Sequence, residues 1–155
     1  MRVFRIQNRR YADSFLDGEG ARLNGGRWNP VGTPLVYTST TPELAVLEVM
    51  VHADGTPLRD LPPQVQVELE VPDDAVERIT AAALPPGWAR SVPPNGLAHF
   101  LLSRLAPGYP FLGFALPSAV MPNSPSLNVL LNPQHPLMKQ VRLIETREHE
   151  FDERL

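Results

Sequence analysis

The chain has 155 residues, of which 43% are hydrophobic and 20% are charged, and its formal net charge is −3 at pH 7. This composition predicts one folded domain over residues 1–155, and the acidic balance argues against direct nucleic-acid binding, which usually needs a concentrated basic face. The chain has no cysteine, no apolar run as long as a membrane span and no apolar N-terminal signal, so we expect a cytoplasmic protein of bacterial type without disulfides or membrane contact.

The first half of the chain predicts two short strands and one helix. Alternating apolar and polar residues predict a strand over 3–6, and β-branched and aromatic residues predict another over 35–39. Five glycines make residues 17–33 a flexible, turn-rich segment. A hydroxyl cap at Thr41, followed by a proline and an acidic residue, predicts a helix that ends near 51–52.

The second half is dominated by strand patterns. Residues 64–71 alternate apolar and polar side chains, which is typical of a strand with a core on one side only. A short helix is predicted over 97–105, and further strands over 111–121, 127–131 and 140–144. The charged tail from Glu145 is expected to be a solvated end. Strands outnumber helices without regular alternation, so the predicted class is α+β, a compact single domain with a largely antiparallel sheet.

Glu48 is the candidate catalytic carboxylate. It is the only charged residue between Leu44 and Val51, and it shares a helical face with both. A carboxylate among apolar neighbours is costly unless it is paired or used. Its alternative role is structural: a glutamate at the edge of an apolar stripe that reaches water or pairs with an arginine.

Arg27 is the candidate anion-binding residue. Two glycines precede it and allow a ligand or another backbone to approach closely. Arginine offers a fixed fork of donors suited to phosphate or carboxylate. The alternative is a hairpin turn in which Arg27 and Trp28 pack through a cation–π contact. With the aromatic plane of Tyr37 and the carboxylate of Glu48, the set indicates a pocket for an anionic ligand that also carries a positive centre.

Other familiar catalytic patterns are absent from the sequence. Ser118 lies in an apolar segment without a Gly-x-Ser-x-Gly elbow, so it does not predict a serine nucleophile. The four histidines never occur at metal-ligand spacing. Gly18-Glu19-Gly20 is not followed by the rest of a dinucleotide fingerprint. We therefore expect neither a serine triad nor a bound metal.

Taken in order, the motifs of this chain resemble those of the RES domain, the toxin half of RES–Xre toxin–antitoxin modules. The resemblance spans nearly the whole chain and rests on Gly-Ala at 20–21, Gly-Gly-Arg-Trp-Asn at 25–29, Val-Tyr-Thr-Ser at 36–39, Leu-Ala-x-Leu-Glu-Val at 44–49, Val-His at 51–52, Leu-Pro-Ser-Ala-Val at 116–120, Asn-x-Leu-Leu-Asn-Pro-x-His-Pro at 128–136 and Phe-Asp-x-Arg-Leu at 151–155. The arginine, glutamate and serine that name the family map onto Arg27, Glu48 and Ser118. Residues 96–100 lack the acid and the tryptophan of a Gly-Asp-x-Trp-like motif that members often show.

This resemblance implies a fold akin to the ADP-ribosyltransferase toxins and an activity that destroys NAD⁺, which is a substrate and not a cofactor. It also implies a partner antitoxin of the Xre type that masks the site and supplies DNA binding. Inorganic phosphate is a candidate second substrate, and a homodimer within a larger toxin–antitoxin complex is left open.

The resemblance and the charge pattern together imply a role for each residue. Glu48 would stabilise the cationic ribose as the nicotinamide–ribosyl bond breaks, and Arg27 would bind the diphosphate or a phosphate acceptor. Tyr37 would stack against or orient the nicotinamide, and Ser118 would bind the ligand or position Glu48. The candidate substrate-binding residues are Trp28, which could line the same wall, and Asn29 and Asn128, which could make polar contacts or brace loops.

Three functions stay open at this stage. The first is NAD⁺ cleavage, by a glycohydrolase that uses water or a phosphorylase that uses phosphate. The second is transfer of ADP-ribose to a protein target. The third is a non-catalytic module that uses the pocket to hold an antitoxin segment.

Overall fold

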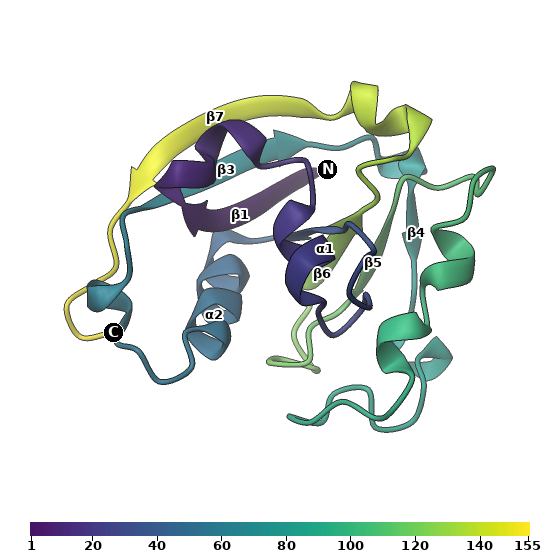
Figure 1. Ribbon diagram of the computed structural model, residues 1–155, viewed down its shortest axis with the longest axis horizontal. Helices are drawn as coiled ribbons and strands as arrows, with labels where there is room; N and C mark the ends of the chain where they lie inside the picture. The colour runs from purple at the N-terminus through teal and green to yellow at the C-terminus, as the bar shows by residue number, and fades with distance from the viewer.

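The computed structural model describes residues 1–155 and contains a single seven-stranded sheet with two α-helices (Figure 1). The strands are β1 (Arg2–Asn8), β2 (Val36–Ser39), β3 (Gln64–Glu70), β4 (Val76–Arg78), β5 (Gly113–Pro117), β6 (Leu127–Leu131) and β7 (Arg142–His149), and the helices are α1 (Glu19–Asn24) and α2 (Pro42–His52). The spatial order is β4-β5-β6-β2-β1-β3-β7. Only the β4–β5 pair is parallel. The predicted α+β class with a largely antiparallel sheet is therefore confirmed.

The two clearest sequence patterns form the elements they predict. In β3 the side chains of Val65, Val67 and Leu69 are buried, while their polar neighbours are only partly covered. Helix α2 begins where the cap signals place it, because the Thr41 hydroxyl accepts a hydrogen bond from the backbone N–H of Leu44. No helix in the structure has the length and apolar character that crossing a membrane requires.

Several predicted boundaries were wrong. The segment 17–33 contains α1, whose start is stabilised where the Asp17 carboxylate accepts a hydrogen bond from the Glu19 N–H. Residues 97–105 form two short 3₁₀ turns instead of one helix, and the strand predicted over 111–121 is confined to β5. These segments are short, so packing and local hydrogen bonds outweigh helix or strand propensity.

The C-terminal region differs most from the prediction. The expected strand over 140–144 and solvated tail form one strand, β7, which pairs with β3 from Arg142 to His149. A bulge interrupts the register between Glu68 and Leu69. The prediction failed because β7 is a charged edge strand, in which long-range pairing replaces the apolar alternation that a sequence pattern requires.

The strand register defines two faces of the sheet. Residues opposite one another on adjacent strands point to the same side. Glu68, Phe4, Ser39, Asn128 and Leu116 form one row across β3, β1, β2, β6 and β5. We call this side the site face, and the other side the back face.

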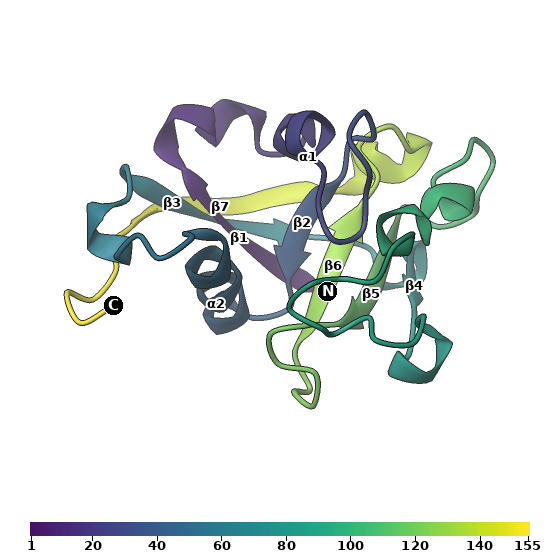
Figure 2. The ribbon, with the colours of Figure 1, turned by 60° about the horizontal axis from the view of Figure 1, so that its bottom comes forward.

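Each face has its own cover and its own core. Helix α2 packs on β1 and β2 at the site face, and the 3₁₀ segment 9–14 lies on the opposite side of the sheet (Figure 2). The back-face core contains 11 buried residues centred on valines and leucines of β1, β2, β3 and β6. The site-face core contains nine, drawn from β5, β6 and the segments 28–35 and 79–101. The candidate active site lies between α2 and the site-face core.

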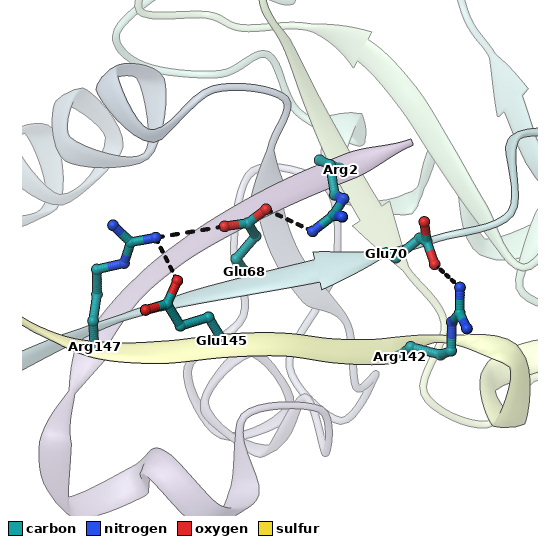
Figure 3. Close-up of polar contacts among 6 residues, drawn as sticks. All are labelled: Arg2, Glu68, Glu70, Arg142, Glu145 and Arg147. Carbon is teal, nitrogen blue, oxygen red and sulfur yellow. Dashed lines mark hydrogen bonds and ion pairs between the residues drawn. The ribbon is translucent and has the colours of Figure 1, made fainter.

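Beyond α2 the site face is polar. Glu68 pairs with Arg2 at 2.8 Å and with Arg147 at 3.7 Å, and Arg147 also pairs with Glu145 at 2.6 Å (Figure 3). A second pair joins Glu70 of β3 and Arg142 of β7. We call this set of six charged residues the polar ladder.

Candidate active site

Glu48 is held by two neutral side chains that come from distant parts of the chain. Its Oε1 atom accepts a hydrogen bond of 2.8 Å from the Ser118 hydroxyl and one of 2.7 Å from Nδ2 of Asn128. Glu48 projects from α2, Ser118 directly follows β5, and Asn128 lies on β6. The fold therefore brings together three of the predicted site residues around one carboxylate oxygen.

The two donors are themselves fixed. The Ser118 side chain is fully buried, and its Oγ accepts hydrogen bonds from the backbone N–H groups of Val120 at 3.0 Å and Met121 at 3.4 Å. These acceptor contacts leave the hydroxyl hydrogen for Glu48. On the other side, the buried Ser39 hydroxyl donates to Oδ1 of Asn128 at 3.1 Å. Ser118 is therefore placed to position Glu48.

The second carboxylate oxygen of Glu48 has no hydrogen-bond partner, and no arginine or lysine pairs with this residue. The glutamate is half-buried, between Leu44, which is buried, and Val51, which is exposed. The alternative of an arginine-paired glutamate is thus not what the structure contains. A carboxylate that is held at one oxygen and open at the other retains its negative charge for a ligand.

The negative charge of Glu48 acts on Arg27, but the Arg27 guanidinium is hydrogen-bonded to backbone carbonyls and not to Glu48. Its Nη1 donates to the backbone carbonyls of Trp88 at 2.8 Å and Arg90 at 2.9 Å, and Nη2 has a longer contact of 3.5 Å with that of Ser91. The turn at 26–29 is confirmed by a backbone bridge between Gly26 and Asn29. No cation–π contact joins Arg27 to Trp28. The guanidinium binds backbone carbonyls instead, so the alternative of a cation–π pair was wrong.

The electrostatic surroundings of Arg27 are mixed. Burial lowers the pKa of Arg27, while the negative charge of Glu48, and that of Tyr37 if it ionised, act to raise it. Arginine remains protonated at any physiological pH, so the site contains one permanent positive charge and one carboxylate without a direct ion pair between them. Such an arrangement suits a ligand with both an anionic and a cationic part.

Tyr37, Asn29 and Trp28 form a second hydrogen-bonded group on the same face. The Tyr37 hydroxyl donates to Oδ1 of Asn29 at 2.7 Å and accepts from the backbone N–H of Trp28 at 3.2 Å. Nδ2 of Asn29 donates to the carbonyls of Ala21 and Thr33, which closes the loop after α1. Burial raises the pKa of Tyr37, so the phenol stays protonated and keeps donating.

A glycine is required beside this group. A Cβ atom at position 26 would lie 2.6 Å from the Tyr37 hydroxyl and 2.9 Å from Oδ1 of Asn29. Real Cβ contacts are not that short, so Gly26 lets the tyrosine hydroxyl close on the turn that carries Arg27. The close approach inferred from the sequence is thus one made by the protein itself.

Trp28 belongs to the core and not to an open wall. Only 2% of it is exposed, and its ring lies 6.4 Å from that of Trp88 and 6.3 Å from that of Phe100. Trp88 is only half-buried. Neither Trp88 nor Ser39 was singled out from the sequence. No local pattern identifies them, because their hydrogen bonds are with Arg27 and Asn128, about 60 to 90 positions away.

The seven predicted residues therefore form two adjacent groups. Ser39 and Tyr37 are two residues apart on β2, so both point to the site face. Strand β2 thereby links the residues around Glu48 to the residues around Tyr37. Glu48, Ser118 and Asn128 make up the first, and Arg27, Trp28, Asn29 and Tyr37 the second. No three histidine, aspartate or glutamate side chains gather closely enough to hold a metal ion.

A hollow of about 450 Å³ lies away from these groups, near Met1, Asp73 and Arg142. The amino group of Met1 pairs with Asp73 at 2.8 Å, and Arg142 pairs with Glu70. Since these charges already neutralise one another, this hollow offers no free group for an ionic ligand.

Comparisons with known proteins identify the family. The RES domain family model matches residues 2–152. A protein of Sphingobium sp. (strain YBL2) named Prs ADP-ribosylating toxin is 34% identical over 152 residues, covering 95% of this chain and 90% of that protein. A protein of Photorhabdus laumondii named Toxin Res is 32% identical over 162 residues, covering 100% and 97%. Another Toxin Res, from Pseudomonas putida, is 37% identical over 134 residues, covering 86% of each.

The fold has a solved counterpart. A chain in the crystal structure of the M. tuberculosis MbcT–MbcA toxin–antitoxin complex superposes with a TM-score of 0.68 at 20% identity, covering 96% of this chain and 83% of that one. This likeness concerns the arrangement of helices and strands. The family model over residues 2–152 and the relatives at 32–37% identity establish that the chain belongs to the RES domain family.

Proposed function

We propose that this chain is a toxin that destroys NAD⁺ by cleaving the nicotinamide–ribosyl bond, and that an antitoxin holds it inactive. The observation that carries the proposal is the geometry of Glu48, whose Oε1 is fixed by two neutral donors while its other oxygen stays open. The names of the relatives, Toxin Res and Prs ADP-ribosylating toxin, support the toxin and the NAD⁺-dependent chemistry.

Bond cleavage creates positive charge where Glu48 can stabilise it. As the bond between ribose C1′ and the nicotinamide nitrogen breaks, its electron pair leaves with nicotinamide, which becomes neutral, and C1′ gains oxocarbenium character. A carboxylate beside C1′ stabilises this transition state more than the ground state. An oxygen of water or phosphate then bonds to C1′, and its proton is released to solvent.

The neighbouring residues have supporting roles in this proposal. Ser118 and Asn128 hold Glu48 in one orientation, so little reorganisation is needed as charge develops. Arg27 retains N–H donors beyond those bound to backbone carbonyls, and these bind a phosphate of NAD⁺. Tyr37 orients the nicotinamide end, and Asn29 keeps the tyrosine in place.

The acceptor decides between two enzyme classes. The purified chain, free of antitoxin, is mixed with NAD⁺, and nicotinamide release is followed with and without inorganic phosphate. Release that requires phosphate identifies an NAD⁺ phosphorylase, and release without it identifies an NAD⁺ glycohydrolase. No release from protein shown to be folded would contradict the proposal and favour a non-catalytic module that binds an antitoxin segment.

A second function is favoured by one relative, the Sphingobium protein named as an ADP-ribosylating toxin. Transfer of ADP-ribose to a protein uses the same bond cleavage, with a protein side chain as the acceptor. The two functions differ in where the label of adenine-labelled NAD⁺ appears. Free ADP-ribose or its phosphate supports NAD⁺ destruction, and label that stays on a protein in denaturing gels supports transfer.

The proposal includes a cytoplasmic antitoxin of the Xre type, which would supply the DNA binding that the acidic chain does not favour. It also includes a homodimer as the unit of the toxin within the complex. Co-expression with an Xre-type antitoxin tests the partner, and the mass of the resulting complex, measured by light scattering, tests the dimer. A complex with one toxin copy would contradict the dimer.

A further inference from the structure

Arg27 is only partly available to a ligand. A guanidinium has five N–H donors, and both donors of Nη1 are used by the carbonyls of Trp88 and Arg90. The long contact from Nη2 to Ser91 occupies a third weakly. What remains is the Nε–Nη2 edge, which has room for one phosphate group. NAD⁺ carries two phosphates, so a single partly used arginine leaves one of them without a cation.

Arg90 supplies an unused cation on the loop that Arg27 holds. Its backbone carbonyl is bound by Arg27, so the backbone of Arg90 lies beside the Arg27 guanidinium. The Arg90 side chain is exposed, forms no ion pair and donates no hydrogen bond. It folds over Gly87, where a Cβ atom would lie 3.2 Å from its Nε and where the backbone has a φ of +78°. The glycine therefore makes room for a guanidinium that has no partner in the protein.

Trp88 adds an aromatic surface to this corner. Phe100, Trp28 and Trp88 form a series of rings, in which Trp28 is buried in the middle and Trp88 lies half-exposed at one end. The carbonyl of Trp88 is bound to Arg27, and its indole lies against Trp28, the residue that follows Arg27.

We infer that Arg90 and Trp88 form the second half of the ligand site, in which Arg90 binds the second phosphate of a dinucleotide and Trp88 stacks on its adenine ring. This inference deepens the proposed function and rests on it. An unpaired guanidinium and a half-exposed indole on one loop are suited to a phosphate next to an aromatic base. Because Arg27 holds this loop by its carbonyls, binding at both arginines also fixes the loop.

The test uses ADP, which has the diphosphate and the adenine but no bond to cleave. Binding is measured by calorimetry and by tryptophan fluorescence, which is specific because Trp28 and Trp88 are the two tryptophans of the chain. A charge-assisted hydrogen bond corresponds to about tenfold or more in affinity, so Arg90→Ala should weaken ADP binding by about that factor. The matched control is Arg78→Ala, an exposed arginine on the back face of β4 without an ion pair.

A second pair of variants tests the indole. Trp88→Ala should weaken ADP binding about 5- to 50-fold through lost stacking, and Trp88→Phe should restore most of it. In turnover assays, Arg90→Ala should raise the KM for NAD⁺ and leave the kinetics with nicotinamide riboside unchanged, since that substrate has no phosphate.

Two results would overturn the inference: ADP that does not bind the native chain, or ADP that binds Arg90→Ala and the native chain equally. Its failure is distinguishable from failure of the proposed function. NAD⁺ cleavage unaffected by Arg90→Ala would reject the arginine and keep the activity. ADP binding that depends on Arg90 in a chain without NAD⁺ cleavage would keep the site and reject the activity.

Discussion

Two glutamates associated with the same sheet face have opposite surroundings. Glu68, on β3, is bound by Arg2 and lies near Arg147 in the polar ladder (Figure 3). Glu48, on α2, is bound by the neutral side chains of Ser118 and Asn128 and by no cation. The first carboxylate is neutralised by the protein, and the second is oriented without being neutralised.

This difference separates a structural charge from a functional one. An arginine beside a carboxylate cancels much of the field that a ligand would feel. Neutral donors fix the direction of the carboxylate and leave its charge in place, which is the condition for stabilising a developing cation. Both carboxylates are held by other side chains, so the chemical type of the partner is the informative feature.

The largest expected effect separates the two glutamates directly. Glu48→Gln keeps the shape of the side chain and removes its charge, so the rate of nicotinamide release should fall by about 100-fold or more. Glu68→Gln, the matched change in the polar ladder, should leave that rate within about twofold of the native value. Equal activity of Glu48→Gln and the native chain would remove Glu48 from the mechanism.

The next effect concerns the donors that orient Glu48. Asn128→Ala removes one of the two hydrogen bonds to Oε1, and a hydrogen bond to a charged group corresponds to roughly 10- to 100-fold in rate. We expect a loss in kcat of that size with little change in the KM for NAD⁺. Asn24→Ala on α1 is the control for an asparagine outside the site. A native kcat for Asn128→Ala would show that Glu48 needs no support from β6.

A third effect sharpens the role of the tyrosine group. Tyr37→Phe leaves Oδ1 of the buried Asn29 and the N–H of Trp28 without their partner, which should lower the free energy of unfolding by about 1–3 kcal/mol. Urea denaturation measures this. Tyr11→Phe, at an exposed position, is the control.

The same variant predicts a pH dependence. Because burial raises the pKa of Tyr37 above its ordinary value near 10, the folded chain keeps a proton that the unfolded chain loses. The stabilisation is therefore complete below about pH 10 and decreases as the pH rises further. The native chain should lose stability above that pH more steeply than Tyr37→Phe. Parallel loss in both would contradict the assignment to Tyr37.

The smallest effect is expected in the polar ladder. Arg147→Ala removes two ion pairs. Half of the Arg147 and Glu145 side chains is exposed, at 52% and 50%, and Glu68, which is 17% exposed, keeps its pair with Arg2. Exposed pairs contribute little, so the free energy of unfolding should fall by less than about 1 kcal/mol, and by less still in high salt. A salt-independent loss of several kcal/mol would mean that the ladder holds the sheet together.

Elements with strong local signals could be predicted from the sequence. The alternation in β3 and the cap of α2 need only neighbouring residues, and both formed as expected. Helix α1 and strand β4 are short and carry weak patterns, and β7 lacks an apolar alternation because it is an edge strand. The positions of β4 and β7 depend on pairing with the distant strands β5 and β3, which no local pattern contains.

The candidate site shows the same contrast between local sequence signals and long-range contacts. Glu48 was conspicuous as a charge in an apolar helix, and Arg27 as a cation after two glycines. Ser118 and Asn128, the two donors to Glu48, were also among the expected site residues. The contacts behind them were not predictable. Ser39 reaches Asn128, and the carbonyl of Trp88 reaches Arg27, only because the sheet and the 79–101 segment fold together. The sequence thus indicated the charged groups and the donors to Glu48, and missed Ser39 and Trp88, which hold these residues in place.

The most direct test of the central claim is a crystal structure of the Glu48→Gln variant with intact NAD⁺ bound. We expect the nicotinamide ribose to lie against the side chain at position 48, with the diphosphate at Arg27. NAD⁺ bound away from position 48, or absent at saturating concentration, would contradict the claim that the open oxygen of Glu48 serves bond cleavage.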